Sequence, residues 1–435
     1  MKTLLRAAAT LAVLAVAAVA ALGQAGGASG DGRIVEQAKF ALPAFEQIPE
    51  RFQRRYGRET IDAMSAPGLE LSKIKYTSDG LKIVGFVYKP AHASGQKLPA
   101  VIFNRGGLED GRIGAQNFNY FYEMYRLASA GFVVLASQYR GTDGSEGKDE
   151  VGGADTNDVI NLIGVARNLG YVDMNRVFMW GYSRGGLMAL QAAGRGAPIR
   201  AVAVVGPPTD YGQGLQENPA VIRLARERWP DFEARRDEHV VSRSPVRWAD
   251  KINVPVLILQ GGADPAVSPL QAMALAQKLE EAGRLYELVV YARDDHPITA
   301  NAEDRIRRTI DWFKNVRVPS IIQPLRQSLR AGGVEAAVRR YHELRKAEAD
   351  RYDFAEAELN NFGYELLFTN RVKDAIEIFK LNVAAYPEAF NTYDSLGEAY
   401  LADGQRDLAV KNYKRSLELN PQNANAVEVL KRIGQ

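Results

Sequence analysis

Apolar runs alternate with helix-like segments from residue 98 to residue 292, and this alternation constrains the fold more than any other feature of the chain. Six of the runs are apolar almost throughout, as expected of strands buried on both faces: LPAVIFN, FVVLASQY, RVFMWG, AVAVVG, VPVLILQGG and ELVVYA. Helical patterns such as NYFYEMYRLASAG and NDVINLIGVARNLG lie between them. Strands that alternate with helices predict a doubly wound, mostly parallel α/β sheet, with ligands at the edge formed by the strand carboxyl ends.

A hairpin is predicted just before these strands, and a helical excursion among them. Alternating runs flank Ser78-Asp79-Gly80, and Asp-Gly between such runs favours a tight hairpin turn. Residues 26–70 are polar with scattered aromatic residues, which predicts one or two short helices on the main domain. Residues 210–252 are rich in charge and contain Trp229, Phe232 and Trp248. A small helical cap over the ligand edge is expected there, with an ordinary long connection as the alternative.

Beyond residue 320 the strand pattern stops and an internal repeat begins. Its positions recur at an interval of 34 residues, as from Gly363 to Gly397. The first unit has Leu359, Phe362, Gly363, Leu366, Ala375, Phe379 and Pro387, and the second has Tyr393, Leu396, Gly397, Tyr400, Ala409, Tyr413 and Pro421. This period and residue order resemble the tetratricopeptide repeat, a pair of closely packed helices. A third, irregular unit is expected in PLRQSLRAGGVEAAVRRYHELRKAEA, because about three repeats are needed to bury a continuous core.

Composition narrows the classes of function. The 435 residues exceed one ordinary domain, and 46% hydrophobic with 25% charged residues describes a folded chain. The 55 basic and 52 acidic residues form no long run of either sign, which argues against a nucleic-acid partner. The absence of cysteine excludes disulfides, a cysteine nucleophile and thiolate metal sites. No metal or other cofactor is expected, and the predicted substrate is a small peptide or an ester.

The first 25 residues have the order of a secretory signal. Met1, Lys2 and Arg6 precede the apolar stretch AAATLAVLAVAAVAALG, which ends among small residues. An uncleaved N-terminal anchor is the alternative, since the stretch is close to the minimum length of a membrane helix. Both interpretations predict an exported enzyme, periplasmic or extracellular, with no membrane contact beyond this segment. The predicted organisation is a signal over 1–25, an N-terminal segment over 26–70, a catalytic domain over 71–318 and a helical-repeat domain over 320–435.

The stretch GYSRGG follows the apolar strand VFMW and precedes the helical LMALQAA. It satisfies G-x-S-x-G in the strand-to-helix context that gives this motif meaning, with Ser183 as the displayed nucleophile. Glycine is needed on both sides because side chains would collide in so sharp a turn. Taken alone the pattern is weak, because a serine that caps the following helix explains it almost as well.

A base and its partner acid are sought after the later strands, where the order Ser, Asp or Glu, His of α/β-hydrolases places them. His296 stands directly after the last strand, in YARDDHPI, whereas the other three histidines are elsewhere: His92, His239 and His342. Asp264 follows the preceding strand, in LILQGGADP, and is the predicted acid. Ser183 would attack, His296 would carry its proton and Asp264 would orient the imidazole. Asp294 and Asp295 lie too close to His296 in sequence and are expected to shape its loop.

The oxyanion donors predicted beside Ser183 are backbone N–H groups. One belongs to Arg184, at the start of the helix, and the second belongs to Gly106 or Gly107, in the loop after LPAVIFN.

Two interpretations are open for the side chains near the predicted triad. Arg105, Arg140 and Tyr182 are candidates for orienting a substrate, although the arginines are more simply explained by pairing with Asp155 or Asp158. Those two aspartates also fit the N-cap and first turn of their helix. A further acidic cluster lacks the spacing of a calcium loop and is expected to be solvated: Asp143, Glu146, Asp149 and Glu150.

From about Leu71 to Phe313 the chain resembles the catalytic domain of the prolyl oligopeptidase family of serine peptidases, which shares its fold with dienelactone-hydrolase-like esterases. The matching stretches are YRGTDGSEG, GGADTNDVINLI, GYVDMNRVFMWGYSRGGLMAL, SRSPVRWADKINVPVLILQGGAD and LYELVVYARDDH. The resemblance implies the same Ser183, Asp264 and His296 triad. The chain departs from the family at Arg105, where a tyrosine or histidine is frequent, and at Arg184, where tyrosine is common. Arg184 is therefore expected to make the rim of the pocket more cationic.

The length of the N-terminal segment limits what the resemblance implies about substrate specificity. Residues 26–70 are too few for the family's β-propeller, so dipeptidyl-peptidase specificity does not follow.

The leading hypothesis is an exported serine hydrolase of small peptides, with a carboxylesterase as the alternative. A second alternative is a non-catalytic scaffold whose helical repeats bind a protein partner or a second copy of the chain.

Overall fold

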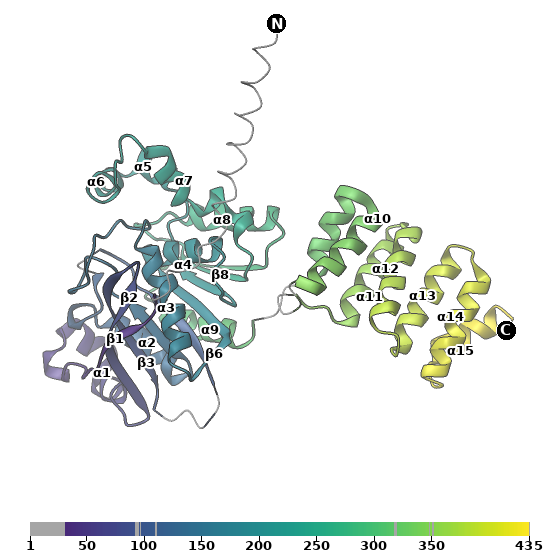
Figure 1. Cartoon of the computed structure of the whole chain (residues 1–435), viewed down its shortest axis with the longest axis horizontal. Coiled ribbons are helices and arrows are strands. Elements are labelled where there is room, and N and C mark those ends of the chain that lie inside the picture. Colours follow the sequence, from purple (N-terminus) through teal and green to yellow (C-terminus); the bar gives the residue numbers. More distant parts are fainter. Residues whose placement is uncertain are drawn as a thin grey trace, which may run out of the picture. The chain divides into compact units, whose positions relative to one another are not determined.

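The computed structural model describes residues 31–434, except 92–94, 96, 109–110, 317–319, 348 and 350–351. The predicted signal segment, and His92, therefore lie outside the described residues. The chain divides between Asn315 and Val316 into two compact units, a sheet flanked by helices and an all-helical unit (Figure 1). Among the described residues, no helix has the length and apolar content required to cross a bilayer.

The first unit contains a nine-stranded sheet with the order β1-β2-β3-β5-β4-β6-β7-β8-β9. Its strands are β1 Ile34–Lys39, β2 Leu69–Ser78, β3 Leu81–Pro90, β4 Leu98–Asn104, β5 Val133–Ser137, β6 Val172–Tyr182, β7 Val202–Val205, β8 Val256–Gly261 and β9 Tyr286–Tyr291. Pairing is antiparallel from β1 to β5 along that order and parallel from β5 to β9. The predicted doubly wound, mostly parallel α/β fold is confirmed.

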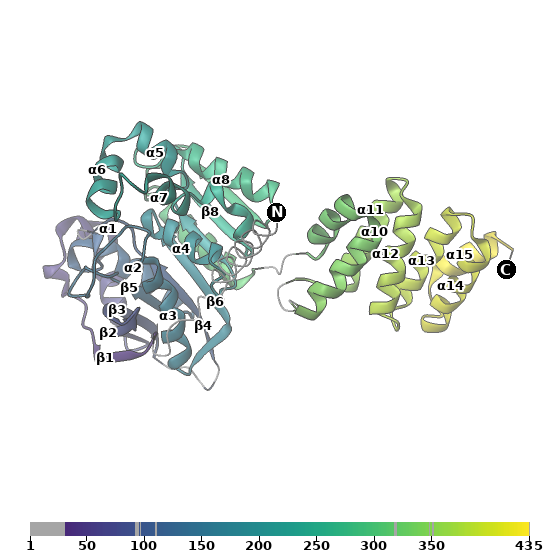
Figure 2. The same cartoon turned by 45° about the horizontal axis from the view of Figure 1, so that its top comes forward.

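Helices cover both faces of this sheet (Figure 2). They are α2 Asn119–Ser129, α3 Thr156–Asn168, α4 Arg184–Gly194, α8 Pro269–Glu281 and α9 Ala302–Lys314, with the short turn η3 Ala115–Asn117 before α2. The side chains of strand β6 show why both faces of the sheet are buried. Val177 and Met179 join the core with α3, α4 and α8, whereas Phe178, between them, stacks on Phe313 of α9 at 4.8 Å between ring centroids. Because side chains alternate along a strand, an apolar residue at every position gives two buried faces.

The predicted hairpin is present, but the N-terminal segment is only partly as expected. Asp79 and Gly80 have φ of 51° and 76°, the left-handed pair of a two-residue turn between β2 and β3. Helices η1 Phe45–Gln47 and α1 Glu50–Ala63 fulfil the helical prediction. The strand β1, however, contradicts it, since Ile34–Lys39 pairs with β2 at the sheet edge. Its side chains are mostly exposed, so no apolar alternation marked it in the sequence.

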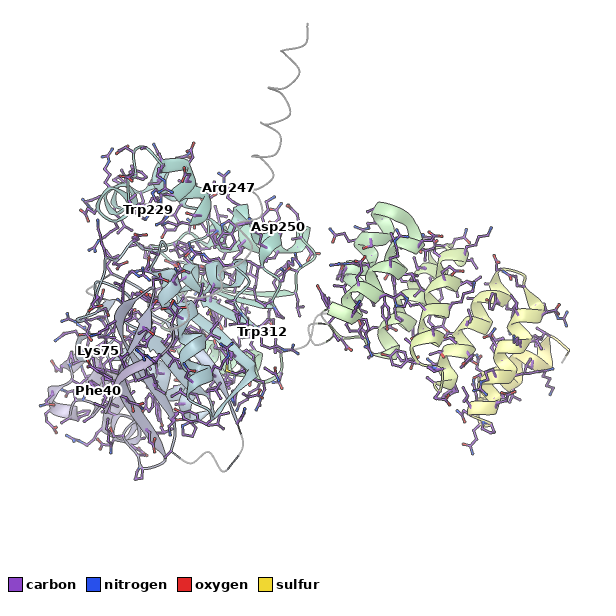
Figure 3. The ribbon with its side chains drawn as sticks, viewed as in Figure 1. Phe40, Lys75, Trp229, Arg247, Asp250 and Trp312 are labelled. Carbon is purple, nitrogen blue, oxygen red and sulfur yellow. The ribbon has the colours of Figure 1, made fainter. Side chains whose placement is uncertain are left out.

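Residues 210–252 form the predicted helical excursion. Its helices are α5 Tyr211–Glu217, α6 Pro219–Arg228, α7 Arg236–Ser242, η4 Pro245–Arg247 and η5 Ala249–Lys251. Trp229, labelled in Figure 3, belongs to a small apolar cluster with Tyr211, Phe232 and Leu187 of α4. The excursion is therefore anchored on the helix that follows Ser183.

The second unit consists of paired helices. They are α10 Ile322–Ala347, α11 Glu356–Phe368, α12 Val372–Ala385, α13 Phe390–Ala402, α14 Arg406–Leu419 and α15 Ala424–Arg432. Helix α10 is interrupted at Gly332-Gly333, which divides the predicted third unit into two helical segments. A Cβ on Gly363 would lie 2.5 Å from the ring of Phe379, and one on Gly397 would lie 3.2 Å from that of Tyr413. The repeated sequence thus produces equivalent close contacts.

Candidate active site

Ser183 occupies a strained turn between β6 and α4. Its φ and ψ are 52° and −122°, outside the helical range, and its side chain makes no capping hydrogen bond to α4. A Cβ on Gly181 would lie 2.2 Å from the carbonyl oxygen of Gly185, and one on Gly185 would lie 2.0 Å from that of Asn104. Only glycine fits at these two positions. The structure therefore removes the helix-cap explanation of the serine and favours its display for chemistry.

Asp264 and His296 are joined by a short hydrogen bond. Nδ1 of His296 lies 2.6 Å from Oδ2 of Asp264. The other carboxylate oxygen of Asp264 accepts the backbone N–H groups of Ala266 and Val267 at 2.8 and 2.9 Å. Burial opposes ionisation of this carboxyl, but the hydrogen bonds from His296 and Val267 outweigh it and lower its pKa. Asp264 is thus an ionised, fixed acceptor that orients the imidazole.

The ends of β6 and β7 bring the histidine to the serine turn. Ser183 donates its backbone N–H to Val205 at 2.8 Å. The next residue, Gly206, lies against His296, because a Cβ there would be 3.0 Å from Nδ1 of the imidazole. The ring of Tyr182 lies 5.0 Å from the same imidazole, between centroids. The three predicted triad residues therefore share the carboxyl edge of the sheet.

Backbone N–H groups are available at the predicted oxyanion positions. The loop after β4 packs directly on the serine turn, since a Cβ on Gly106 would lie 2.7 Å from the Tyr182 ring. Gly107 has a φ of 70°, which favours glycine. Within the described part of the chain, the N–H groups of Arg184, Gly106 and Gly107 meet no hydrogen-bond acceptor. Unpaired donors beside a displayed hydroxyl are what stabilisation of an oxyanion requires.

The side chain of Arg184 corrects the expectation of a cationic pocket rim. It is buried and donates to both carboxylate oxygens of Asp149, at 2.8 and 2.5 Å, and to Asp155 at 2.8 Å. Burial opposes the guanidinium charge, but Asp155 and Asp149 outweigh it and raise the pKa of Arg184. The third contact of this group is the carbonyl of Gly107, at 3.2 Å. Arg184 therefore braces the loop after β4, which holds the predicted oxyanion donors Gly106 and Gly107, from inside the fold.

Arg105 and Arg140 are likewise occupied within the fold, so neither orients a substrate. Arg105 is fully buried and donates to the carbonyl groups of Gly106, Leu108 and Gln138. Burial lowers its pKa. Arg140 pairs with Asp158 at 2.7 Å and with Asp79 at 2.8 Å, which confirms the pairing alternative for this arginine.

The acidic residues of the loops, and His239, form their contacts with other residues of the hydrolase domain. Asp149 contradicts the expectation of a solvated cluster, because it is buried against Arg184. Asp155 precedes α3 but does not cap it with its side chain, which accepts the N–H groups of Gly152 and Gly153 instead. Asp294 accepts from Ala300 and Asn301, as expected of a loop-shaping residue. His239 contacts Pro230 and Arg243 within the excursion.

No spacing rule identifies Asp149 as the partner of a residue 35 positions away, and the sequence reasoning missed it. The one available signal was a charged residue at the start of a helix that is otherwise apolar. Such a residue needs a buried countercharge. The described residues contain no cluster of metal-ligating side chains.

These features define an α/β-hydrolase with a serine, a histidine and an aspartate at the ligand edge of its sheet. The model of the Prolyl oligopeptidase family matches residues 118–317. The uncharacterised peptidase YtmA of Bacillus subtilis is 28% identical over 249 residues, which cover 57% of this chain and 94% of YtmA. The hydrolase domain is therefore similar to the serine-type peptidases of the prolyl oligopeptidase family.

More distant relatives share this domain only. Human dipeptidyl peptidase 8 is 27% identical over 240 residues, covering 51% of this chain and 25% of the human protein. The structure of Pyrococcus horikoshii acylaminoacyl peptidase superposes with a TM-score of 0.51 at 20% identity, covering 58% of this chain and 43% of that one. This likeness shows the fold alone. The chain thus spans nearly all of YtmA but less than half of these two proteins.

Proposed function

We propose that the protein is an exported peptidase of small peptides in which Ser183, His296 and Asp264 form the catalytic triad. The observation that carries the proposal is the 2.6 Å Asp264–His296 hydrogen bond beside a serine held at a φ of 52° without a capping bond. Ser183 attacks the scissile carbonyl and gives its proton to His296. The histidine then protonates the leaving amine, and a water that it activates hydrolyses the acyl-enzyme.

The oxyanion of each tetrahedral intermediate is bound by the N–H group of Arg184 and by that of Gly106 or Gly107. Asp264 stays ionised throughout and stabilises the imidazolium that forms at His296. Tyr182 contacts both His296 and the Gly106 loop, so its ring fixes the spacing between the base and the oxyanion donors.

A fluorophosphonate probe tests the nucleophile. The wild-type protein is expected to be labelled and Ser183→Ala is not. Equal labelling of the two proteins would contradict the assignment of Ser183 as the nucleophile. Turnover of peptide amides against p-nitrophenyl esters then decides the substrate class, and activity on esters alone would replace the peptidase by a carboxylesterase.

Export rests on the order of charged, apolar and small residues in 1–25. Expression of the full chain with fractionation tests it. The enzyme is expected outside the cytoplasm, with a mature N-terminus near residue 25 if the segment is cleaved. Recovery of the intact chain in the cytoplasm would contradict export.

The helical unit is proposed to be a tetratricopeptide array that binds a protein partner or a second copy of the chain. The support is the 34-residue recurrence from Gly363 to Gly397, each glycine packed under an aromatic ring. Deletion after residue 319 should leave hydrolysis intact and change the oligomeric state or partner binding. A deletion that alters none of these properties would defeat the recruitment role.

A further inference from the structure

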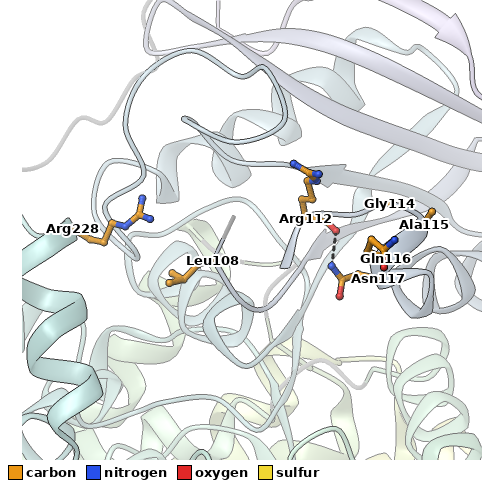
Figure 4. A pocket seen from close by; sticks show the side chains of 7 residues that line it. All are labelled: Leu108, Arg112, Gly114, Ala115, Gln116, Asn117 and Arg228. Atoms are coloured by element: carbon orange, nitrogen blue, oxygen red, sulfur yellow. Dashed lines mark hydrogen bonds between the residues drawn. The ribbon is translucent and has the colours of Figure 1, made fainter. Parts of the chain in front are cut away.

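An open cavity of about 820 Å³ lies between the loop after β4 and the helical excursion. It is lined by Leu108, Arg112, Gly114, Ala115, Gln116, Asn117 and Arg228. Figure 4 shows Arg228, the last residue of α6, on one side and Arg112 on the other, with Leu108 between them. The volume is within the range of small-molecule sites in proteins.

The two arginines differ from those buried in the core. Arg140 and Arg184 have carboxylate partners at 2.7 and 2.5 Å. Within the described residues, neither Arg112 nor Arg228 forms an ion pair, although both line one cavity. Two arginines that line one cavity, without a carboxylate partner among the described residues, make this cavity positively charged, which favours an anionic ligand.

Both walls of the cavity are fixed by contacts outside it. The amide side chain of the buried Gln138 binds the N–H and the C=O of Ile113, at 2.9 and 2.8 Å, next to Arg112. Arg51 of α1 donates to the carbonyl of Gln116 at 2.7 Å. On the opposite wall, Trp229 follows Arg228 and is buried in the cluster that includes Leu187 of α4. The two guanidinium groups therefore project from anchored backbone.

The cavity also adjoins the proposed catalytic centre. Leu108 lines it and directly follows Gly107, one of the two candidate oxyanion donors. Consecutive Cα atoms are about 3.8 Å apart. A peptide whose scissile carbonyl lies at the oxyanion donors can thus place a group one or two residues away into the cavity.

We propose that this cavity is a substrate subsite in which Arg112 and Arg228 bind a carboxylate, so that the enzyme prefers peptides with a negative charge close to the scissile bond. The inference rests on the proposed function, since it assumes that the cavity is a part of the substrate site. The fork of N–H donors on arginine matches a carboxylate in two-point hydrogen bonding. A peptide offers this group either as an Asp or Glu side chain or as its C-terminus.

Binding is measured with the full chain carrying Ser183→Ala, so that no turnover occurs. Three fluorescent peptides of one sequence are compared by anisotropy: one has a free C-terminus and neutral side chains, one is amidated with a single Glu, and one is amidated with Gln in place of Glu. At least one acidic peptide should bind about tenfold or more tighter than the neutral peptide, the order expected of charge-assisted hydrogen bonds. The tighter of the two acidic peptides identifies the source of the carboxylate.

Arg112→Gln and Arg228→Gln, each added to this protein, should remove most of the acidic preference and leave binding of the neutral peptide unchanged. Arg223→Gln is the matched control, since Arg223 is exposed on the same helix but does not line the cavity. Equal binding of all three peptides would overturn the proposal. An equal effect of Arg223→Gln would overturn it as well, because the preference would then come from surface charge in general.

Labelling of wild type by the fluorophosphonate separates this inference from the proposed function. A labelled enzyme without acidic preference contradicts only the carboxylate subsite. An acidic preference that depends on both arginines, in a protein that is not labelled, contradicts only the catalytic assignment. In an enzyme that retains Ser183 and is labelled by the probe, Arg112→Gln and Arg228→Gln should lower kcat/KM for the acidic peptide alone.

Discussion

The hydrolase domain and the helical domain bury different kinds of side chain. The described part of the hydrolase domain has five buried arginines, Arg105, Arg140, Arg184, Arg243 and Arg305, whereas the described part of the helical domain has no buried arginine or lysine. In the first domain, charged contacts join loops that are far apart in sequence, as from Arg184 to Asp149. In the second, most contacts join helices that are neighbours in the chain from α11 to α15, and α10 packs mainly on α12.

The difference shows two ways in which a sequence specifies structure. Repeated apolar contacts can be specified locally, and the stability of such an array is close to a sum over neighbours. A site that must hold a base, an acid and two oxyanion donors at fixed positions needs contacts between remote loops. All four tryptophans belong to the hydrolase domain: Trp180, Trp229, Trp248 and Trp312. Tryptophan fluorescence therefore reports unfolding of that domain alone, whereas far-UV circular dichroism reports both.

Ser183→Ala should have the largest effect. Loss of the proposed nucleophile is expected to reduce kcat by about 10⁶-fold, the order found when a triad serine is removed. Unfolding of both domains should be unchanged, because the hydroxyl makes no capping bond. Ser268→Ala is the control, since Ser268 does cap α8 through the N–H of Leu270. It should keep activity and lose about 1 kcal/mol of stability. Substantial hydrolysis by the Ser183→Ala protein would contradict the assignment of Ser183 as the nucleophile.

Asp264→Asn should reduce kcat by about 10⁴-fold, since an amide cannot hold the imidazole as the carboxylate does. The folded state lowers the pKa of Asp264, so its contribution to stability is complete above the pKa of the unfolded state, near 4, and is lost as pH falls through the lower folded value. Urea unfolding followed by tryptophan fluorescence should therefore lose stability below pH 4 in wild type, and less so in Asp264→Asn. Parallel losses in both proteins would assign the effect to other carboxyls.

Arg184→Met should destabilise the hydrolase domain by about 3–5 kcal/mol, because Asp149 and Asp155 stay buried without their countercharge. Tryptophan fluorescence should show this shift in urea. If Arg184→Met does not fold, Arg184→Lys is measured instead. Lysine retains the charge but not the two-point contact with Asp149, so this variant should lower kcat more than it raises KM. Arg326→Met is the control in the helical domain, where an exposed pair with Glu365 is worth about 0–1 kcal/mol. Similar losses in the two variants would contradict the contrast between the domains.

Gly363→Ala should have a smaller effect, confined to the helical domain. Its Cβ would lie 2.5 Å from the Phe379 ring, and overpacking of this kind costs about 1–3 kcal/mol. Gly397→Ala is its matched partner one repeat later, with 3.2 Å to the Tyr413 ring, and should cost less. Circular dichroism should register the loss while tryptophan fluorescence stays unchanged. A shift in the fluorescence transition would show that the two domains unfold together.

Much of the fold was predictable, because apolar runs and turn residues are local signals. The strands β4 to β9, the turn at Asp79-Gly80 and the excursion over 210–252 are where the sequence predicts them. Strand β1 was missed because an exposed edge strand has no apolar period. The order of Ser183, Asp264 and His296 along the chain followed from the strands, since each residue stands directly after one.

The parallel sheet, the helical repeat and the residues gathered at one edge of the sheet could be predicted from the amino-acid sequence, because they depend on periodicity and on chain order. The roles of the arginines became visible in the folded arrangement. Arg184, Arg140 and Arg105 are used inside the fold, whereas Arg112 and Arg228 are brought to one cavity from segments more than a hundred residues apart. This difference arises because the state of a charge depends on its neighbours in space, which the periodicity of a sequence does not encode.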